Sequence, residues 1–318
     1  MQHGLRTRKH GFTLVEILVV IVIIAILGAI ATPAILRALD SAKAGATVVE
    51  INLLSNAVEA YRTEYGSYPP DFSDKFAVIN HLNRIFPRRQ EILNVEQLDE
   101  YLVASGFSPG GAYAVHAHAL VFWLRGFYPN PEYPITGNGI GDRQPLIEIN
   151  VNMIQGDGNL ETLDDVFVSA QHGSGINPPF VYFDSRSCDN VQQSYWGEYG
   201  SGTCAPKTFL WNGPDGQLVA VPYLGTILSN PNDPNSIEFV NEKSFQIIAA
   251  GQDKLYGFIT ESSNQEDTSY ANINALRNAL QTNVRNEAKI FPNGGNYALS
   301  DRDNLTNFST KRLGDAVE

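Results

Sequence analysis

The sequence has little cysteine and little basic charge. It contains two cysteines in 318 residues, and no Cys-x-x-Cys pair or close His partner is present, which disfavours a zinc site. Lys and Arg total 22 against 34 Asp and Glu, a net charge of −12. An acidic surface opposes nucleic-acid binding, which depends on Lys and Arg against phosphate. We therefore expect no nucleic-acid partner.

The sequence also lacks the common enzyme signatures. It has no G-x-S-x-G, no P-loop, no H-E-x-x-H and no G-x-G-x-x-G after a predicted strand. Gly173-Ser174-Gly175 lies beside His172, but no acid is positioned to complete a catalytic group. We expect this chain to catalyse no reaction.

One long apolar run lies near the N-terminus. A leader with three basic residues and no acid precedes it, and from Phe12 to Ala31 the one charged residue is Glu16. Twenty apolar residues in a helix rise about 30 Å, which is enough to cross a bilayer core. The basic flank predicts that this end stays in the cytoplasm.

Two simpler interpretations of the run are a secretory signal and a plain membrane anchor. A secretory signal has a small-residue cleavage site after its apolar core, whereas here the core continues into a long helical pattern. A plain anchor gives no reason for Glu16, because a carboxylate in such a run costs about 2.5–3.5 kcal/mol on insertion scales. Both interpretations are disfavoured.

The start of the chain resembles type IV prepilins and type II secretion pseudopilins. Their pattern is a basic leader ending in Gly, then Phe-Thr-Leu-x-Glu, an apolar helix and a Pro near its end. The matching residues are Gly11, Phe12, Thr13, Leu14, Glu16 and Pro33. The resemblance implies that a prepilin peptidase cuts between Gly11 and Phe12 and methylates the new amine. It also implies that Glu16 pairs with that amine, on a neighbouring subunit or its own, as an ammonium suits a carboxylate in a dry bundle.

We expect an α+β pilin fold, in which a long N-terminal helix packs on an antiparallel β-sheet head with extra helices. The predicted parts are a cleaved leader (1–11), a transmembrane and assembly helix (12–65) and an extracytoplasmic head (66–318). Removal of the leader leaves 19 basic residues against 34 acidic ones, a net charge of −15.

The second half of the long helix has apolar residues at helical spacing. The predicted core-facing stripe is Ile35, Leu39, Ala42, Ala46, Val49, Leu53, Ala57 and Ala60. Gly28 and Pro33 weaken the helix between its halves, so we expect a bend or local melting there. Gly66 and Pro69-Pro70 predict an end near Tyr65.

The rest of the chain is predicted to hold short helices and then short strands. The helices are expected near 76–85, 95–103, Tyr113–Phe127 and Tyr270–Glu287. His116 and His118 are interpreted as structural, because positions i and i+2 do not share a helix face. The candidate strands are Leu146–Val151, Val166–Ser169, Phe180–Asp184, Thr208–Trp211, Gln217–Tyr223 and Phe245–Ala250.

The two cysteines, Cys188 and Cys204, are predicted to form a disulfide. The predicted topology places both outside the cytoplasm, where disulfides persist. A bridge would close a polar, Gly-rich loop of about 15 residues, which contributes roughly 3 kcal/mol in the chain-entropy model.

Two C-terminal segments, SFQIIAAGQDKLYG (244–257) and SDRDNLTNFS (300–309), resemble the calcium loop of the type II secretion major pseudopilin. The matching residues are Ala250, Gly251, Asp253, Gly257, Asp301, Asp303, Leu305, Asn307 and Phe308. The resemblance implies Ca²⁺ bound by Asp253, Asp301 and Asp303, because calcium takes 6–8 oxygen ligands. About forty residues, 258–299, are inserted where the family has a short loop. The alternative is a metal-free turn with Asp253 and Asp301 as caps.

A weaker calcium candidate is Asp157-Gly158-Asn159, which begins like an EF-hand loop. Its glycine and its later ligands are misplaced, so we interpret it as a polar turn.

The resemblance implies a structural subunit of a type II secretion-like pseudopilus. The alternatives are a type IV pilin for adhesion, motility or uptake, and a membrane-tethered binding or enzyme domain that does not polymerise. The implied partners are prepilin peptidase, copies of the chain, other pilin-like subunits, an inner-membrane assembly platform and membrane lipid. The implied location is a single pass through the inner membrane, with the head in the periplasm or outside and the subunits assembled into a filament.

Overall fold

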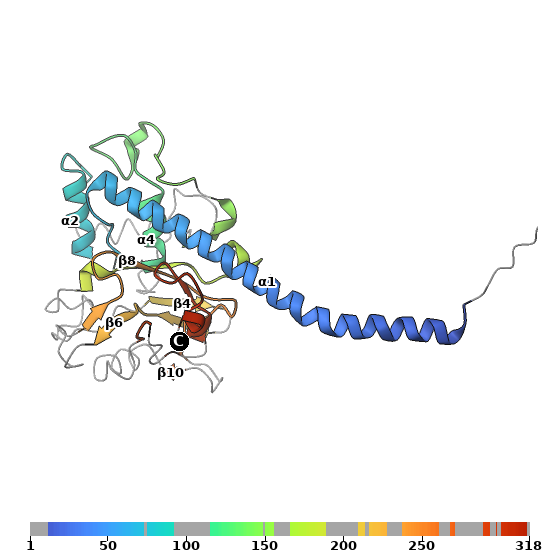
Figure 1. Ribbon diagram of the computed structural model, residues 1–318. Coiled ribbons are helices and arrows are strands. Elements are labelled where there is room, and N and C mark those ends of the chain that lie inside the picture. Colours follow the sequence, from blue (N-terminus) through green and yellow to red (C-terminus); the bar gives the residue numbers. More distant parts are fainter. Residues whose placement is uncertain are drawn as a thin grey trace, which may run out of the picture. The chain divides into compact units, whose positions relative to one another are not determined.

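The computed structural model describes residues 12–72, 75–91, 115–148, 150–155, 166–188, 209–213, 216–227, 237–260, 268–270, 289–292, 297 and 300–316. The chain divides into two compact units, Met1–Lys43 and Ala44–Glu318. Helix α1, Leu14–Tyr65, contributes residues to both units (Figure 1).

Helix α1 ends where the sequence predicts. Tyr65 is its last residue, and Gly66 follows with a positive φ of 79° while its amide bonds to the Arg62 carbonyl. The helix is continuous across Pro33, so the alternative of local melting is not found. Proline removes a single ladder hydrogen bond, and that loss alone does not open the helix.

The buried face of α1 differs from the predicted stripe. Its buried residues are Ala44, Thr47, Glu50, Ile51, Leu54, Ala57, Val58 and Tyr61. In the predicted stripe, Val49 is 66 % exposed, Leu53 is 38 % exposed, and only Ala57 is fully buried. The prediction was wrong by about one residue, which is 100° around a helix. The stripe relied on alanines, which tolerate either face, whereas the buried face gathers the larger side chains.

Three further α-helices are described in the second unit: α2 (Lys75–Ile85), α4 (Val115–Leu124) and α7 (Leu313–Ala316). The predicted helices near 76–85 and Tyr113–Phe127 are therefore confirmed, the second with shorter bounds. The predicted helix near 95–103 and residues 271–287 of the other lie outside the described residues. Short 3₁₀ turns occur at Gly137–Gly139, Val151–Met153, Ala170–His172, Ser185–Cys188 and Ser300–Asp303.

The strands described in the second unit form four small sheets. They are β1 (Ile154–Gln155), β2 (Val166–Phe167), β3 (Val181–Asp184), β4 (Phe209–Gly213), β5 (Gly216–Ala220), β6 (Leu224–Ile227), β7 (Ile237–Phe239), β8 (Phe245–Ala249), β9 (Phe258–Thr260), β10 (Thr268–Tyr270) and β11 (Leu305–Thr306). The strand orders are β1-β2, β10-β9-β5-β4, β11-β8-β3 and β6-β7. All described pairs are antiparallel except β9 with β10, which is parallel. The α+β arrangement is confirmed.

Most candidate strands are found, with altered ends. One is not: at Leu146–Val151 the described residues form no strand, and Val151–Met153 is a 3₁₀ turn. The Asn150 side chain accepts a hydrogen bond from the Asn152 amide at 3.0 Å, a local bond that competes with strand pairing. The predicted strand Gln217–Tyr223 ends early, at Ala220. Strands β1, β6, β7, β9, β10 and β11 were not predicted, and Tyr270, which was assigned to a helix, is the last residue of β10.

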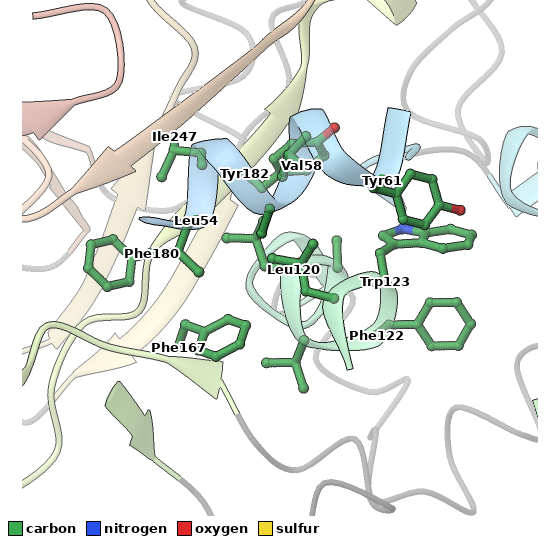
Figure 2. Packing of buried hydrophobic residues seen from close by; sticks show 14 of the residues in the cluster. Leu54, Val58, Tyr61, Leu120, Phe122, Trp123, Phe167, Phe180, Tyr182 and Ile247 are labelled. Carbon is green, nitrogen blue, oxygen red and sulfur yellow. The ribbon is translucent and has the colours of Figure 1, made fainter. Parts of the chain in front are cut away.

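The core of the second unit lies on both faces of the β11-β8-β3 sheet. On one face, Tyr182 and its register partner Ile247 join a cluster with residues of α1 and α4 (Figure 2). On the other face, Val181 and its partner Ile248 pack in a second cluster with Phe209. All five residues of β8 are buried, as expected of a strand covered on both faces, and its one polar side chain, Gln246, is hydrogen-bonded to the backbone of Tyr223.

Candidate functional site

The N-terminal motif leads directly into an exposed apolar helix. Gly11 lies outside the described residues, while Phe12 is 81 % exposed. Every residue from Phe12 to Leu39 is exposed. By length and composition, α1 is the one helix among the described residues that could cross a membrane. The predicted cut between Gly11 and Phe12 stays a prediction.

Glu16 takes part in a capping box at the start of α1. Its Oε2 accepts hydrogen bonds from the Thr13 amide at 2.7 Å and the Thr13 hydroxyl at 2.9 Å. The Glu16 amide in turn donates to the Thr13 hydroxyl at 3.2 Å. Thr13 is thus the N-cap, and Glu16 is the third helical residue. This local role supplies a reason for the glutamate besides pairing with an amine, and the assembly role predicted for Glu16 stays untested.

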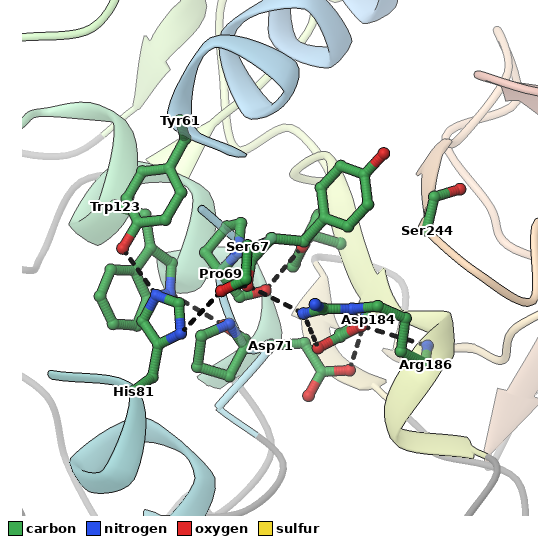
Figure 3. Close-up of polar contacts among 12 residues, drawn as sticks. Tyr61, Ser67, Pro69, Asp71, His81, Trp123, Asp184, Arg186 and Ser244 are labelled. Atoms are coloured by element: carbon green, nitrogen blue, oxygen red, sulfur yellow. Dashed lines mark hydrogen bonds and ion pairs between the residues drawn. The ribbon is translucent and has the colours of Figure 1, made fainter. Parts of the chain in front are cut away.

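The turn after α1 is held by buried donors from two distant elements, α4 and β3 (Figure 3). The Tyr182 hydroxyl donates to the Pro69 carbonyl at 2.7 Å, and the Trp123 indole donates to the Pro70 carbonyl at 2.8 Å. Asp71 accepts a bond from the Asp184 amide at 2.9 Å. These bonds join the end of α1 to α4 and β3, so the turn sets where the helix meets the sheet.

His81 of α2 lies inside this junction. Its Nε2 lies 2.9 Å from the Tyr61 hydroxyl, and its ring packs 5.2 Å from the Trp123 ring, centroid to centroid. Burial, and then the positive charges of Arg84 and Arg186, lower the pKa of His81 to about 3. The ring is therefore neutral at physiological pH and serves as a packing and hydrogen-bonding group.

The two segments of the predicted calcium loop lie side by side. Leu305 of β11 pairs with Ala249 of β8. The Asn307 side chain accepts a bond from the Ile247 amide at 2.9 Å, and the Phe308 ring packs 5.7 Å from the Tyr223 ring. Residues 251–257 and 300–303, named here the aspartate loop, are brought together by this pairing.

Two glycines of the aspartate loop make room for two aspartates. A Cβ on Gly251 would overlap the carboxylate of Asp303, and a Cβ on Gly257 would overlap the carboxylate of Asp301. Gly257 also has a positive φ of 97°. Two glycines and two aspartates of the predicted calcium loop are thus paired in space, Gly251 with Asp303 and Gly257 with Asp301.

Each aspartate of the loop is held by donors of the protein. Asp303 accepts bonds from the amides of Gln252 and Asp253 and forms an ion pair with Arg312 at 2.9 Å. Asp301 accepts the Tyr223 hydroxyl at 3.0 Å and forms an ion pair with Lys289. Asp253 accepts the Leu255 amide at 2.9 Å.

Within the part of the chain that the structure describes, these three carboxylates are not gathered as a shared set of metal ligands. Asp301 lies against Gly257, Asp303 lies against Gly251, and Asp253 is exposed. Among the described residues, no group of three or more His, Cys, Asp or Glu side chains is placed to share a metal ion. Calcium binding at Asp253, Asp301 and Asp303 stays an untested prediction.

The remaining predicted sites fall partly outside the described residues. The side chains of Cys188 and His116 lie outside them, as do Cys204 and Asp157. The disulfide therefore stays a prediction. His118 is buried in α4, in keeping with a structural residue.

Sequence reasoning missed the two cations that face the aspartates, Lys289 and Arg312. Lys289 stands directly before the apolar residues Ile290 and Phe291, and a lone lysine at the edge of such a run was the available signal. Nothing in the sequence connects it with Asp301.

Comparison with known proteins supports the N-terminal motif. Residues 6–32 match the family model of the prokaryotic N-terminal methylation motif. The chain is 36 % identical over 64 residues to the type II secretion system core protein G of Pseudomonas aeruginosa, covering 20 % of this chain and 45 % of that protein. It is 33 % identical over 75 residues to the core protein G of Aeromonas hydrophila, covering 24 % and 52 %.

The chain thus spans about half the length of the curated relatives it matches. No solved structure matches it significantly. The resemblance of this chain to prepilins and type II secretion pseudopilins is confirmed, and the match to the methylation motif covers residues 6–32.

Proposed function

We propose that this chain is a structural subunit of a type II secretion-like pseudopilus, processed by a prepilin peptidase and polymerised through the N-terminal part of α1. The partners would be the peptidase, copies of the chain, other pilin-like subunits, an inner-membrane assembly platform and membrane lipid. The second unit would lie outside the cytoplasm, with the apolar part of α1 in the inner membrane before assembly.

The observation that carries this proposal is the continuity between motif and helix. The methylation motif matches residues 6–32, and the first turn of α1 begins inside it, capped by Thr13 and Glu16. An apolar helix whose side chains are exposed from Phe12 to Leu39 needs lipid or other helices around it. A filament core and a membrane both supply such surroundings.

The experiment is imaging of filaments from cells that express the full chain, with cryo-microscopy of any that form. The proposal expects filaments whose interior contains the N-terminal part of α1. A chain that stays dispersed in the inner membrane, beside an active prepilin peptidase and assembly platform, would show that it is a tethered domain instead. Filaments found at the cell surface rather than in the periplasm would favour the pilus alternative.

A further inference from the structure

A buried cation faces Asp301 in the second unit. Lys289 is 1 % exposed and Asp301 is 0 % exposed, and the Lys289 ammonium forms an ion pair with Asp301 Oδ1. The same ammonium donates to the Tyr256 carbonyl at 2.7 Å and lies 5.9 Å from the centre of the Tyr223 ring. Two charges without access to water must neutralise each other, because either alone would be costly to bury.

The backbone fixes Lys289 beside the aspartate loop. The Leu224 amide donates to the Lys289 carbonyl at 2.8 Å, and the Phe291 amide donates to the Leu224 carbonyl at 2.8 Å. Ile290 thereby forms a parallel bridge with Leu224, at the first residue of β6. Lys289 belongs to the stretch 258–299, which lengthens the loop between the two segments.

Two further polar side chains, those of Tyr223 and Asn304, lie beside Asp301. The Tyr223 hydroxyl donates to Asp301 and accepts a bond from the Asn304 side chain at 3.2 Å. Burial, and then the Asp301 carboxylate, raise the pKa of the Tyr223 phenol well above its usual range, so the hydroxyl keeps its proton. A carboxylate and a main-chain carbonyl are oxygen ligands of the kind that calcium takes, and here both bind an ammonium.

We infer that Lys289 supplies an internal cation to Asp301 in place of a bound divalent metal, so that the C-terminal segment is fastened to the second unit without calcium. Three segments meet at this ammonium, namely the loop ending at Gly257, residues 289–291 and residues 301–304. A second ion pair, between Asp303 and Arg312, neutralises the other carboxylate at the partly exposed side of the loop. This inference does not depend on whether the chain polymerises.

The test is the thermal unfolding of the full chain in detergent, followed by tryptophan fluorescence, with calcium chloride or a chelator. Hydrogen exchange of peptides covering 300–316 reports the same segment locally. The wild-type midpoint and exchange should be the same in both solutions. A midpoint that rises by several degrees in calcium, with the rise abolished by Asp301→Asn, would overturn the inference.

Charge variants separate the ion pair from packing. Lys289→Met removes the positive charge that faces the buried carboxylate of Asp301. The thermal midpoint of this variant should therefore fall by roughly 10 °C. The double variant Lys289→Met/Asp301→Asn removes both charges and should recover most of that loss. The matched control is Lys243→Met at an exposed lysine, which should leave the midpoint unchanged. If the double variant is no more stable than Lys289→Met, the pair is not what holds the segment, and the inference fails.

A smaller side chain tests whether the ammonium stands in for a metal. Lys289→Ala leaves both oxygen ligands and opens space, so calcium should raise its midpoint by several degrees although it has no effect on the wild type. If calcium does not raise the midpoint of Lys289→Ala, the Lys289 ammonium does not take the place of a calcium ion, and the inference fails. Where a single variant fails to accumulate, the double variant and the wild-type calcium comparison still decide the outcome.

Discussion

The carboxylate of Glu16 accepts hydrogen bonds from both the backbone amide and the hydroxyl of Thr13 in the first turn of α1. The glutamate therefore has two separable attributes: hydrogen-bond acceptors that cap a helix, and a negative charge. Glutamine serves equally well at this position of a capping box, although it carries no charge. This difference allows the proposed assembly role to be tested apart from the structural one.

Glu16→Gln should leave the cap intact and reduce filament assembly. Loss of the charge removes the proposed pairing with the Phe12 amine, so the protein recovered in filaments should fall by at least about tenfold, while the membrane-bound amount stays the same. Thr13→Ala is the matched control, because it weakens the cap by about 1 kcal/mol and keeps the charge. Filaments of Glu16→Gln at the wild-type level, with those of Thr13→Ala reduced, would assign the role to capping instead.

Processing is predicted to remove residues 1–11. Mass spectrometry of the native protein should find a chain that starts at methylated Phe12. Gly11→Asp should leave the leader attached, because the resemblance places the cut directly after this glycine. A mature wild-type protein that still begins at Met1 would contradict the proposal.

The cysteines offer a test of topology. Thiol labelling of denatured, non-reduced protein should find neither Cys188 nor Cys204 free, since a compartment outside the cytoplasm favours the disulfide. Reduction before labelling is the control and should expose both thiols. Complete labelling without reduction would mean that the loop is unbridged or that the second unit lies on the cytoplasmic side.

For α1, the sequence predicted the end of the helix better than its buried face. Gly66 and the following prolines fix the end of α1, because a positive φ and a blocked amide stop a helix wherever it packs. The buried face was misassigned because alanines such as Ala46 and Ala60 are accommodated inside or outside. What decides the face is contact with α4 and β3, which are distant in sequence.

The aspartate loop, too, was predictable only in part. Its glycines and aspartates predicted that two segments meet, and Gly251 with Asp303 and Gly257 with Asp301 do meet. The charge that neutralises Asp301 could not be predicted, because Lys289 reaches it through a backbone bridge to Leu224 that leaves no local pattern. A motif can therefore specify the position of a carboxylate without specifying its counter-ion.

The junction around His81 predicts a dependence of stability on pH. Burial and the charges of Arg84 and Arg186 lower the pKa of His81 from 6.5 to about 3 in the folded chain. Between these values the unfolded chain binds a proton that the folded chain does not, so stability rises with pH and is lost as the pH falls below about 6.5. His81→Gln keeps a hydrogen-bonding side chain and removes the titration. On going from pH 7.5 to 5, the thermal midpoint of the wild-type chain in detergent should therefore fall by roughly 5 °C more than that of the variant. Each protein is compared with itself at pH 7.5, which cancels the cost of the substitution and leaves the difference due to the imidazole. Equal losses in the two proteins would mean that His81 takes up its proton in the folded state as readily as in the unfolded one.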